Sequence, residues 1–237
     1  MIEKALKYIV GMKAPEYKVI GDQMYSDKEL HRIVHNPHAD PIRMNTLESF
    51  VEYVKSGVDR LGHMIVHVTS PTTVYFYSVL DQERTREKLV EVVAKVPAFD
   101  FNRFIEHEEF CIALQSKFFD NEDRRLLLQF AGTVEAGTVA QYGDDGVTQK
   151  ATIKQGVAGK QDALVPNPVS LTAYRTFIEV EQPEVNYVFR MKQGAANNVY
   201  CALYEADGGA WEIVAKLRIA NYLRTRLADV PGIMVIS

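Results

Sequence analysis

The sequence predicts an α+β protein in which an antiparallel β-sheet packs against several helices and a C-terminal helix is followed by a short strand. From about residue 146 to residue 207 the chain has the pattern of successive strands. Alternation is clearest where Tyr187, Phe189 and Met191 are separated by Val188, Arg190 and Lys192, which is the period of a strand with one buried and one wet face. Apolar residues recur at helical spacing over 46–57, which adds the helical part of the prediction.

The first forty residues contain two short regular elements and one irregular stretch. We expect a helix over 2–8 and a strand over 17–25. The polar stretch 27–40 contains Pro37 and is followed by Pro41, which indicates irregular or edge backbone.

A helix over 46–57 is predicted by its start signal and its apolar face. Asn45 followed three residues later by Glu48 has the pattern of a capping box. The apolar residues that share one face are Leu47, Phe50, Val51, Val54 and Val58.

The next segments are rich in β-branched and aromatic residues and predict strands. Residues 63–68 and 74–80, with a turn at 70–72, have the pattern of a hairpin. The stretch 89–96 fits either a buried strand or a short helix, and its valines followed by Pro97 favour the strand.

The remaining elements follow from the same signals. They are helices over 104–118 and 122–134, a hairpin turn at 144–146, a reversal at 182–184, a helix over 211–227 and a strand over 233–236. Neither an internal repeat nor a linker is visible, so we expect a single domain over 1–237 with a loose subdivision near residue 137.

Composition excludes some classes of protein. The chain of 237 residues has 27 basic and 31 acidic side chains, a formal net charge of -4, which argues against a protein that mainly coats nucleic acid with a basic surface. Cys111 and Cys201 have no ligand spacing and are expected to be reduced thiols. No apolar run approaches the roughly 20 residues of a membrane span, and no secretory signal is evident. We therefore expect a cytoplasmic protein that does not enter a membrane and needs no cofactor.

The densest set of potential metal ligands is His31, His35 and His38 with Asp40. Neutral imidazoles and a carboxylate suit zinc or iron. A spacing of four places His31 and His35 on one face of a helix, but Pro37 opposes a helix that continues to His38. Exposed loop histidines are the simpler interpretation.

Basic and aromatic residues of the predicted strands are candidates for contact with a nucleotide. Gly156, Gly159 and Lys160 do not form a phosphate loop, because Lys154 stands where the first glycine is required and Gln161 follows the lysine. Strand aromatics beside basic side chains are able to stack a base. The candidate ligand-binding residues are Lys154, Lys160, Arg175, Tyr187, Arg190 and Lys192.

The order of elements and several local strings resemble the YfdQ-like family, a group of phage and prophage proteins of unknown function. The strings are NTLESFVEYVKS, FNRFIEHEEF, VPNPVSLTAYRTFIEVE, VNYVFRMK and VYCALYEAD, within residues 44–228. The resemblance implies a viral origin, expression inside a bacterial cell and genes found beside phage recombination and single-strand-binding functions. It supplies no catalytic residues, and the first 43 residues lie outside it.

Three functions are therefore open. The first is a non-enzymatic, oligomeric accessory protein of a phage that binds a host or phage protein in the bacterial cytoplasm, in phage DNA metabolism or against host defence. The second is a nucleotide or single-stranded nucleic-acid binding protein. The third is a metal-dependent hydrolase that uses the three histidines.

Overall fold

The computed structural model describes residues 2–11, 15–21, 23–26, 38–59, 62–82, 84–142, 149–155, 159–164, 167–194 and 198–237. The chain divides into two units, Met1–His38 and Ala39–Ser237. The first unit has little burial of its own, because every described side chain before residue 27 is exposed except the half-buried Pro15. The single domain over 1–237 with a loose subdivision near residue 137 stays a prediction.

The first unit holds a helix and a hairpin. Helix α1 (Ile2–Gly11) agrees with the prediction and leaves its apolar face exposed. Strands β1 (Tyr17–Ile20) and β2 (Gln23–Ser26) pair antiparallel around Gly21, whose φ of 63° suits the turn. Residues 17–25 therefore contain a hairpin rather than the single strand that the pattern predicts.

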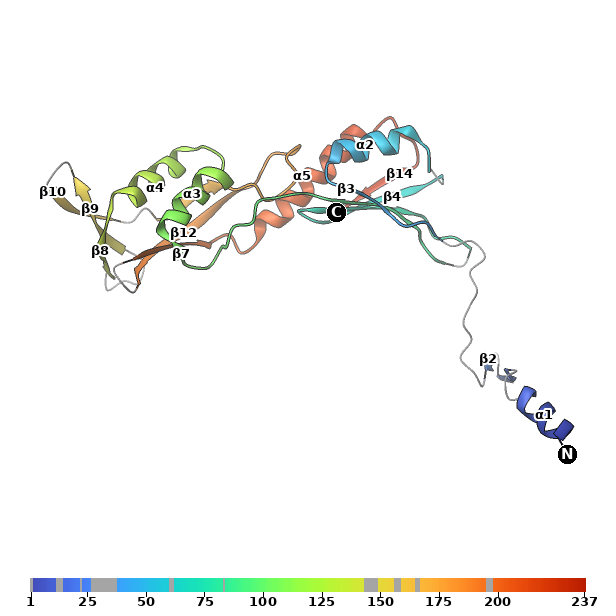
Figure 1. The fold of residues 1–237 in the computed structure, drawn as a ribbon. Coiled ribbons are helices and arrows are strands. Elements are labelled where there is room, and N and C mark those ends of the chain that lie inside the picture. Colours follow the sequence, from blue (N-terminus) through green and yellow to red (C-terminus); the bar gives the residue numbers. More distant parts are fainter. Residues whose placement is uncertain are drawn as a thin grey trace. The chain divides into compact units, whose positions relative to one another are not determined.

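The second unit begins with a mixed five-stranded sheet in the order β14-β4-β5-β6-β3 (Figure 1). The strands are β3 (Ile42–Met44), β4 (Met64–Ser70), β5 (Thr73–Ser78), β6 (Lys88–Val93) and β14 (Ile233–Ile236). The three central strands form an antiparallel meander, and both edge strands pair parallel to their neighbours. The predicted hairpin, the strand that follows it and the C-terminal strand are confirmed.

Two helices cover one face of this sheet (Figure 1). Helix α2 (Leu47–Ser56) has Thr46 as its N-cap, with the Thr46 hydroxyl accepting a hydrogen bond from the Ser49 amide, so the predicted cap at Asn45 is wrong by one residue. Gly57 ends the helix at a φ of 68°. Val58 then lies beyond the helix and is exposed, so its predicted place on the apolar face is also wrong.

Helix α5 (Ala210–Arg226) is the second helix and confirms the prediction for 211–227. Its buried residues and those of α2 pack on the sheet in the first hydrophobic core. The largest members of this core are Leu47, Phe50, Met64, Phe76, Phe177, Ile219 and Leu223.

A second, four-stranded antiparallel sheet follows the order β11-β12-β13-β7. Its strands are β7 (Ile105–Glu106), β11 (Val169–Thr172), β12 (Glu184–Gln193) and β13 (Val199–Glu205). Strand β12 alternates as predicted, with Tyr187, Phe189 and Met191 buried. The α+β fold class is thus confirmed, and each of these two sheets has its own core.

Helices α3 (His107–Lys117) and α4 (Glu122–Thr133) pack on the second sheet. The predicted helix over 104–118 begins later, because Ile105 and Glu106 pair with β13. The Glu106 carboxylate caps α3 by accepting from the Glu108 amide.

Strands β8 (Val134–Tyr142), β9 (Gln149–Gln155) and β10 (Gly159–Leu164) form a three-stranded antiparallel sheet in the order β10-β9-β8. The hairpin turn predicted at 144–146 lies outside the described residues. Within the part of the chain that the structure describes, none of the helices is long and apolar enough to cross a membrane.

Candidate binding surface on the five-stranded sheet

The face of the five-stranded sheet opposite α2 and α5 is formed by residues that alternate with the first core. Strand register aligns these residues in two rows. One row runs Met234–Ile65–Tyr77–Lys88, and the other runs Ile236–His67–Tyr75–Glu91–Arg43. We call these residues the open face. Arg43, Met234 and Ile236 are exposed, and the others are half-buried against one another.

Two tyrosines occupy the centre of the open face. The ring centroids of Tyr75 and Tyr77 lie 5.7 Å apart, and the Lys88 ammonium lies 4.9 Å from the Tyr75 centroid. The Tyr75 hydroxyl donates to the Glu91 carboxylate at 3.3 Å, and Arg43 Nε lies 3.5 Å from the same carboxylate. These contacts order a surface that is aromatic, amphipathic and nearly neutral.

Burial raises the pKa of both tyrosines, and the nearby Glu91 carboxylate raises it further. Both phenols therefore stay protonated at neutral pH. Each then offers a ring and a hydroxyl group for contact, without a charge of its own.

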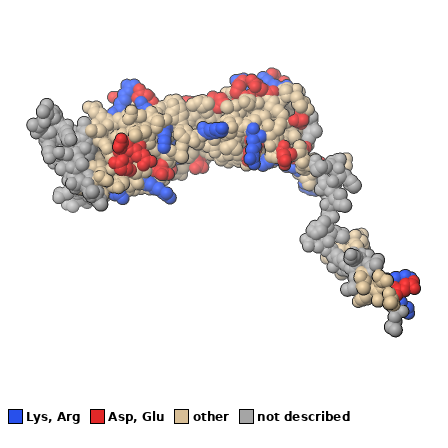
Figure 2. Space-filling view, viewed as in Figure 1, with Lys and Arg blue, Asp and Glu red and all other residues tan. Residues whose placement is uncertain are grey.

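Charged side chains are mixed over the described surface. In the view of Figure 2, lysine and arginine form separate patches interspersed with aspartate and glutamate. On the open face itself, Arg43 is already paired with Glu91. The surface in this view thus lacks the continuous basic stripe expected of a protein that tracks a phosphate backbone.

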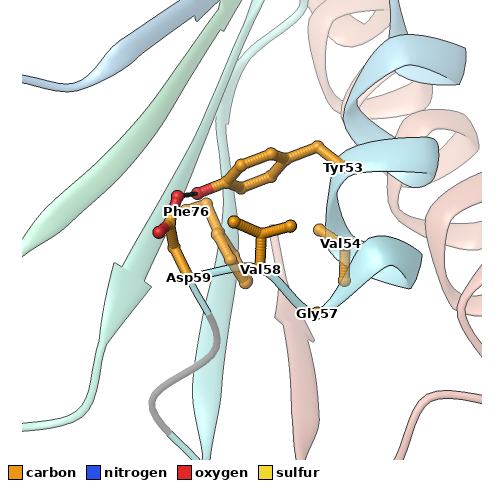
Figure 3. Close-up of a pocket in the computed structure, with 6 residues that line it drawn as sticks. All are labelled: Tyr53, Val54, Gly57, Val58, Asp59 and Phe76. Atoms are coloured by element: carbon orange, nitrogen blue, oxygen red, sulfur yellow. Dashed lines mark hydrogen bonds between the residues drawn. The ribbon is translucent and has the colours of Figure 1, made fainter.

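Small cavities border α2 on the other side of the sheet. One of about 10 Å³ is lined by Tyr53, Phe76 and the turn at Gly57, and Figure 3 shows the Tyr53 hydroxyl directed at Asp59. This hydrogen bond is 2.7 Å long, and burial together with Asp59 raises the pKa of Tyr53 to about 12. The space holds no more than a water molecule. A neighbouring depression of about 330 Å³ shares Tyr53 and Asp59 with it.

A larger, open depression of about 620 Å³ lies beside α5 and is rich in acidic side chains. Each of three carboxylates there already has a structural partner. Asp120 bonds to Arg125 and Arg124, Glu179 accepts from the first amides of α2, and Glu181 lies 3.4 Å from Arg218. The depression therefore resembles a solvated surface more than a reactive site.

Arg175 and Tyr187, two of the candidate ligand-binding residues, lie together in the second core. The Arg175 guanidinium lies 3.6 Å from the Trp211 ring centroid and 4.3 Å from that of Phe101. It also donates to Glu205 and to the Tyr187 hydroxyl. Tyr187 is fully buried and stacks on Phe101, so its ring has no face left for a base. The side chains of Arg175 and Tyr187 therefore both pack inside the second unit.

The other four candidates are dispersed. The Lys192 ammonium is exposed over the Phe104 ring at 4.3 Å, and Arg190 Nη1 donates to the Phe189 carbonyl. Lys154 and Lys160 are register partners in the β9–β10 pair. Ligand binding by these six residues stays a prediction.

His31 and His35 lie outside the described residues, while His38 and Asp40 are exposed. Among the residues that are described, no group of three or more His, Cys, Asp or Glu side chains is placed to hold a metal ion. The metal site on the three histidines stays a prediction.

The open face was not identified from the sequence. The alternation of Ile65 with His67 and of Tyr75 with Tyr77 in the predicted hairpin was the available signal. This alternation does not predict that Met234 and Ile236 belong to the same surface, because they join it only when the C-terminal strand pairs with β4. Comparison with family models, curated proteins and solved structures gave no match for this chain.

Proposed function

We propose that this protein is a non-enzymatic binding protein and that the open face is its docking surface for another protein. The observation that carries the proposal is the pair of half-buried tyrosines in the same two rows as exposed Met234 and Ile236, on a sheet face that none of the described helices covers. Tyrosine, methionine and arginine are enriched in protein interfaces, where a rigid apolar centre is surrounded by polar groups.

The charge of the open face agrees with a protein partner. The Glu91 carboxylate is bonded to Tyr75 and paired with Arg43, so covering the surface does not leave this carboxylate without a partner. An exposed apolar row on a regular sheet is also a rigid platform, which lowers the entropy lost on binding.

The resemblance to the YfdQ-like family supplies the proposed setting. On that ground the protein acts in the cytoplasm of a bacterial host as an accessory factor of a phage, in DNA metabolism or against host defence. The residues themselves support only the binding role.

Tyr77→Lys tests the docking surface because it introduces a charge at the centre of the open face. The matched control is Tyr174→Lys, at a half-buried tyrosine that follows β11 and lies beside Phe119, away from the five-stranded sheet. Proteins captured from a lysate of the host bacterium by the wild type and by each variant are quantified by mass spectrometry.

We expect one partner to fall about tenfold or more with Tyr77→Lys and to persist with the control, as for loss of a hot spot. Circular dichroism establishes that both variants are folded. Equal recovery of every captured protein by the two variants would contradict the proposal.

A second function for the same face is single-stranded nucleic-acid binding, which the neighbouring rings of Tyr75 and Tyr77 beneath Lys88 favour. Fluorescence anisotropy with a labelled oligothymidine at low and physiological salt tests it. Binding that weakens with salt and is lost in Tyr77→Ala and Lys88→Ala supports this function, because phosphate contacts release counterions. Absence of binding at low salt rejects it.

A further inference from the structure

Strand β14 is an edge of the five-stranded sheet, and among the strands that the structure describes none pairs with its outer side. The Gly232 carbonyl accepts from the Met64 amide at 2.9 Å, so the backbone groups of residues 232, 234 and 236 face β4. The groups of Ile233 and Val235 then point outward. In agreement, the Val235 carbonyl accepts from the Arg224 guanidinium at 3.2 Å from outside the sheet.

The other edges of the two larger sheets are β3, β11 and β7, and each is short or carries features that oppose pairing. Strand β7 is only two residues long and includes the charged Glu106. Strand β3 is three residues long, follows Pro41 and carries the charged Arg43. On β11, the Ser170 amide donates to Asp123, the Ser170 carbonyl accepts from Asn121, and the Thr172 carbonyl accepts from the Phe119 amide. Strand β14 has the sequence IMVI, without charge, proline or glycine. It is therefore the edge suited to accept another strand.

Helix α5 adds apolar surface on the same flank. Its residues Ile213, Leu217 and Arg224 are spaced by four and seven positions and so lie along one line of the helix. Arg224 reaches the outer edge of β14, which places that line on the β14 side of α5, while Tyr222 and Arg226 bond to Glu48 of α2. Ile213 is 61% exposed and Leu217 is 47% exposed.

We propose that β14 pairs antiparallel with β14 of a second copy of this chain across a twofold axis. A flank that combines an outer strand edge with the apolar side chains of Ile213 and Leu217 is complementary to itself, as an isologous interface requires, and its one cation, Arg224, is held by the Val235 carbonyl of its own chain. The proposal does not depend on what the open face binds. It joins the five strands of each copy into one sheet and makes the two open faces continuous.

Backbone geometry selects the register. Hydrogen-bonded antiparallel pairs need outward-facing residues on both strands, so Ile233 pairs with Val235 of the second copy and the reverse. This register pairs both outward-facing residues of β14 and places Met234 opposite its own counterpart on the axis. The Val235 carbonyl has a second lone pair, so it keeps the Arg224 bond while it accepts the new one.

Cysteine cross-linking tests this register. In the non-hydrogen-bonded pair on the axis the two Cα atoms are about 4.5 Å apart, within the range of a disulfide. Met234→Cys is therefore expected to give a disulfide-linked dimer on mild oxidation, seen on a non-reducing gel. The matched control Ile236→Cys lies on the same face but roughly 14 Å from its counterpart, too far for a disulfide. Wild type shows the background from Cys111 and Cys201.

Val235→Pro provides a second, independent measurement. Proline at residue 235 removes an amide that points away from β4, so the hydrogen bonds between β14 and β4 remain. The pairing of the two copies loses two hydrogen bonds, one from the residue 235 amide of each copy. Light scattering is expected to give a dimer for wild type and a monomer for Val235→Pro with unchanged circular dichroism.

A wild-type monomer at micromolar concentration would overturn the proposal. So would a dimer in which Met234→Cys forms no more disulfide than Ile236→Cys.

Discussion

Arg175 is a charged residue whose side chain is part of the packing of the second unit. Its guanidinium lies between two aromatic rings and is paired with Glu205, and its side chain is only 14% exposed. A planar cation suits this site because it stacks on Trp211 and Phe101 and donates hydrogen bonds in the same plane. The strand that carries Tyr187 is thus connected to α5 through one arginine.

Arg175→Met is expected to destabilise the fold by about 1–3 kcal/mol, because Glu205 and the Tyr187 hydroxyl lose a partner and both rings lose the cation. Arg175→Lys is expected to recover only part of this, since an ammonium stacks less well than a guanidinium. Urea unfolding followed by circular dichroism measures both variants. Lys192→Ala, at the exposed cation over Phe104, is the control and is expected to cost about 0.5–1 kcal/mol or less. Equal losses for Arg175→Met and Lys192→Ala would contradict the structural role.

Asp120 gives a prediction for acid stability. Hydrogen bonds from Arg125 and then Arg124 lower the pKa of this carboxyl group to about 2 in the folded protein. A lowered folded-state pKa gives stability that is present above the unfolded pKa of about 4 and is lost as the pH falls toward 2. Asp120→Asn is therefore expected to lower the urea midpoint near neutral pH and to have little effect at about pH 2. A midpoint difference that does not shrink over this range would contradict the assignment.

At the scale of elements, the N-terminus of α2 is capped both by the residue that precedes the helix and by a side chain that is distant in the sequence. Thr46 bonds to the Ser49 amide, while Glu179, more than 130 residues later, accepts from the amides of Leu47 at 2.7 Å and Glu48 at 3.4 Å. A carboxylate at this end also faces the positive end of the helix dipole. The loop before β12 is thereby held against α2.

Glu179→Ala is expected to destabilise the protein by about 1–2 kcal/mol, because two amides at the start of α2 lose their acceptor. Glu181→Ala, in the same loop, is the control, because its carboxylate is exposed and pairs with Arg218 at 3.4 Å. Thermal unfolding of the three proteins compares them. If Glu181→Ala lowers the stability as much as Glu179→Ala, the capping hydrogen bonds of Glu179 do not stabilise the protein as proposed.

At the scale of the whole molecule, the second unit is organised by two hydrophobic cores. Helix α5 joins them, since Trp211 packs against the second core and Ile219 and Leu223 lie in the first. The Thr176 hydroxyl also donates to the Pro71 carbonyl, which connects the loop before β12 to the β4–β5 turn. The two cores are thus connected through α5 and through this hydrogen bond.

Removal of residues 1–38 is expected to change the free energy of unfolding of the remaining chain by no more than about 0.5 kcal/mol, as for changes that affect no buried group. The reason is that no described side chain of the first unit is buried. Urea unfolding measures this free energy. Removal of 227–237, which deletes β14 and the buried Leu227, is the contrasting truncation and is expected to destabilise the fold strongly. Equal effects of the two truncations would contradict the division at residue 38.

Local patterns identify most elements of the second unit because they depend on neighbours in the chain. The alternation of Tyr187, Phe189 and Met191 predicted β12, and the apolar face of 47–54 predicted α2. The pattern failed where a tertiary contact competes with local preference. Residues 105–106 were predicted as helix and instead pair with β13 as a strand. The candidate cations Arg175 and Lys192 lie over rings from elsewhere in the chain, and their role in ligand binding stays a prediction.

The sequence by itself determined the α+β class, the positions of the main helices and strands of the second unit, and which face of β12 is buried, because periodicity and turn residues act over a few positions. Only the tertiary structure decided where the candidate binding surface lies. The open face needs β14 beside β4, a pairing of residues about 170 positions apart, and Tyr187 is buried against the Phe101 ring, which lies 86 positions earlier in the chain. Such contacts depend on which apolar faces meet in space, and this information is not contained in local spacing.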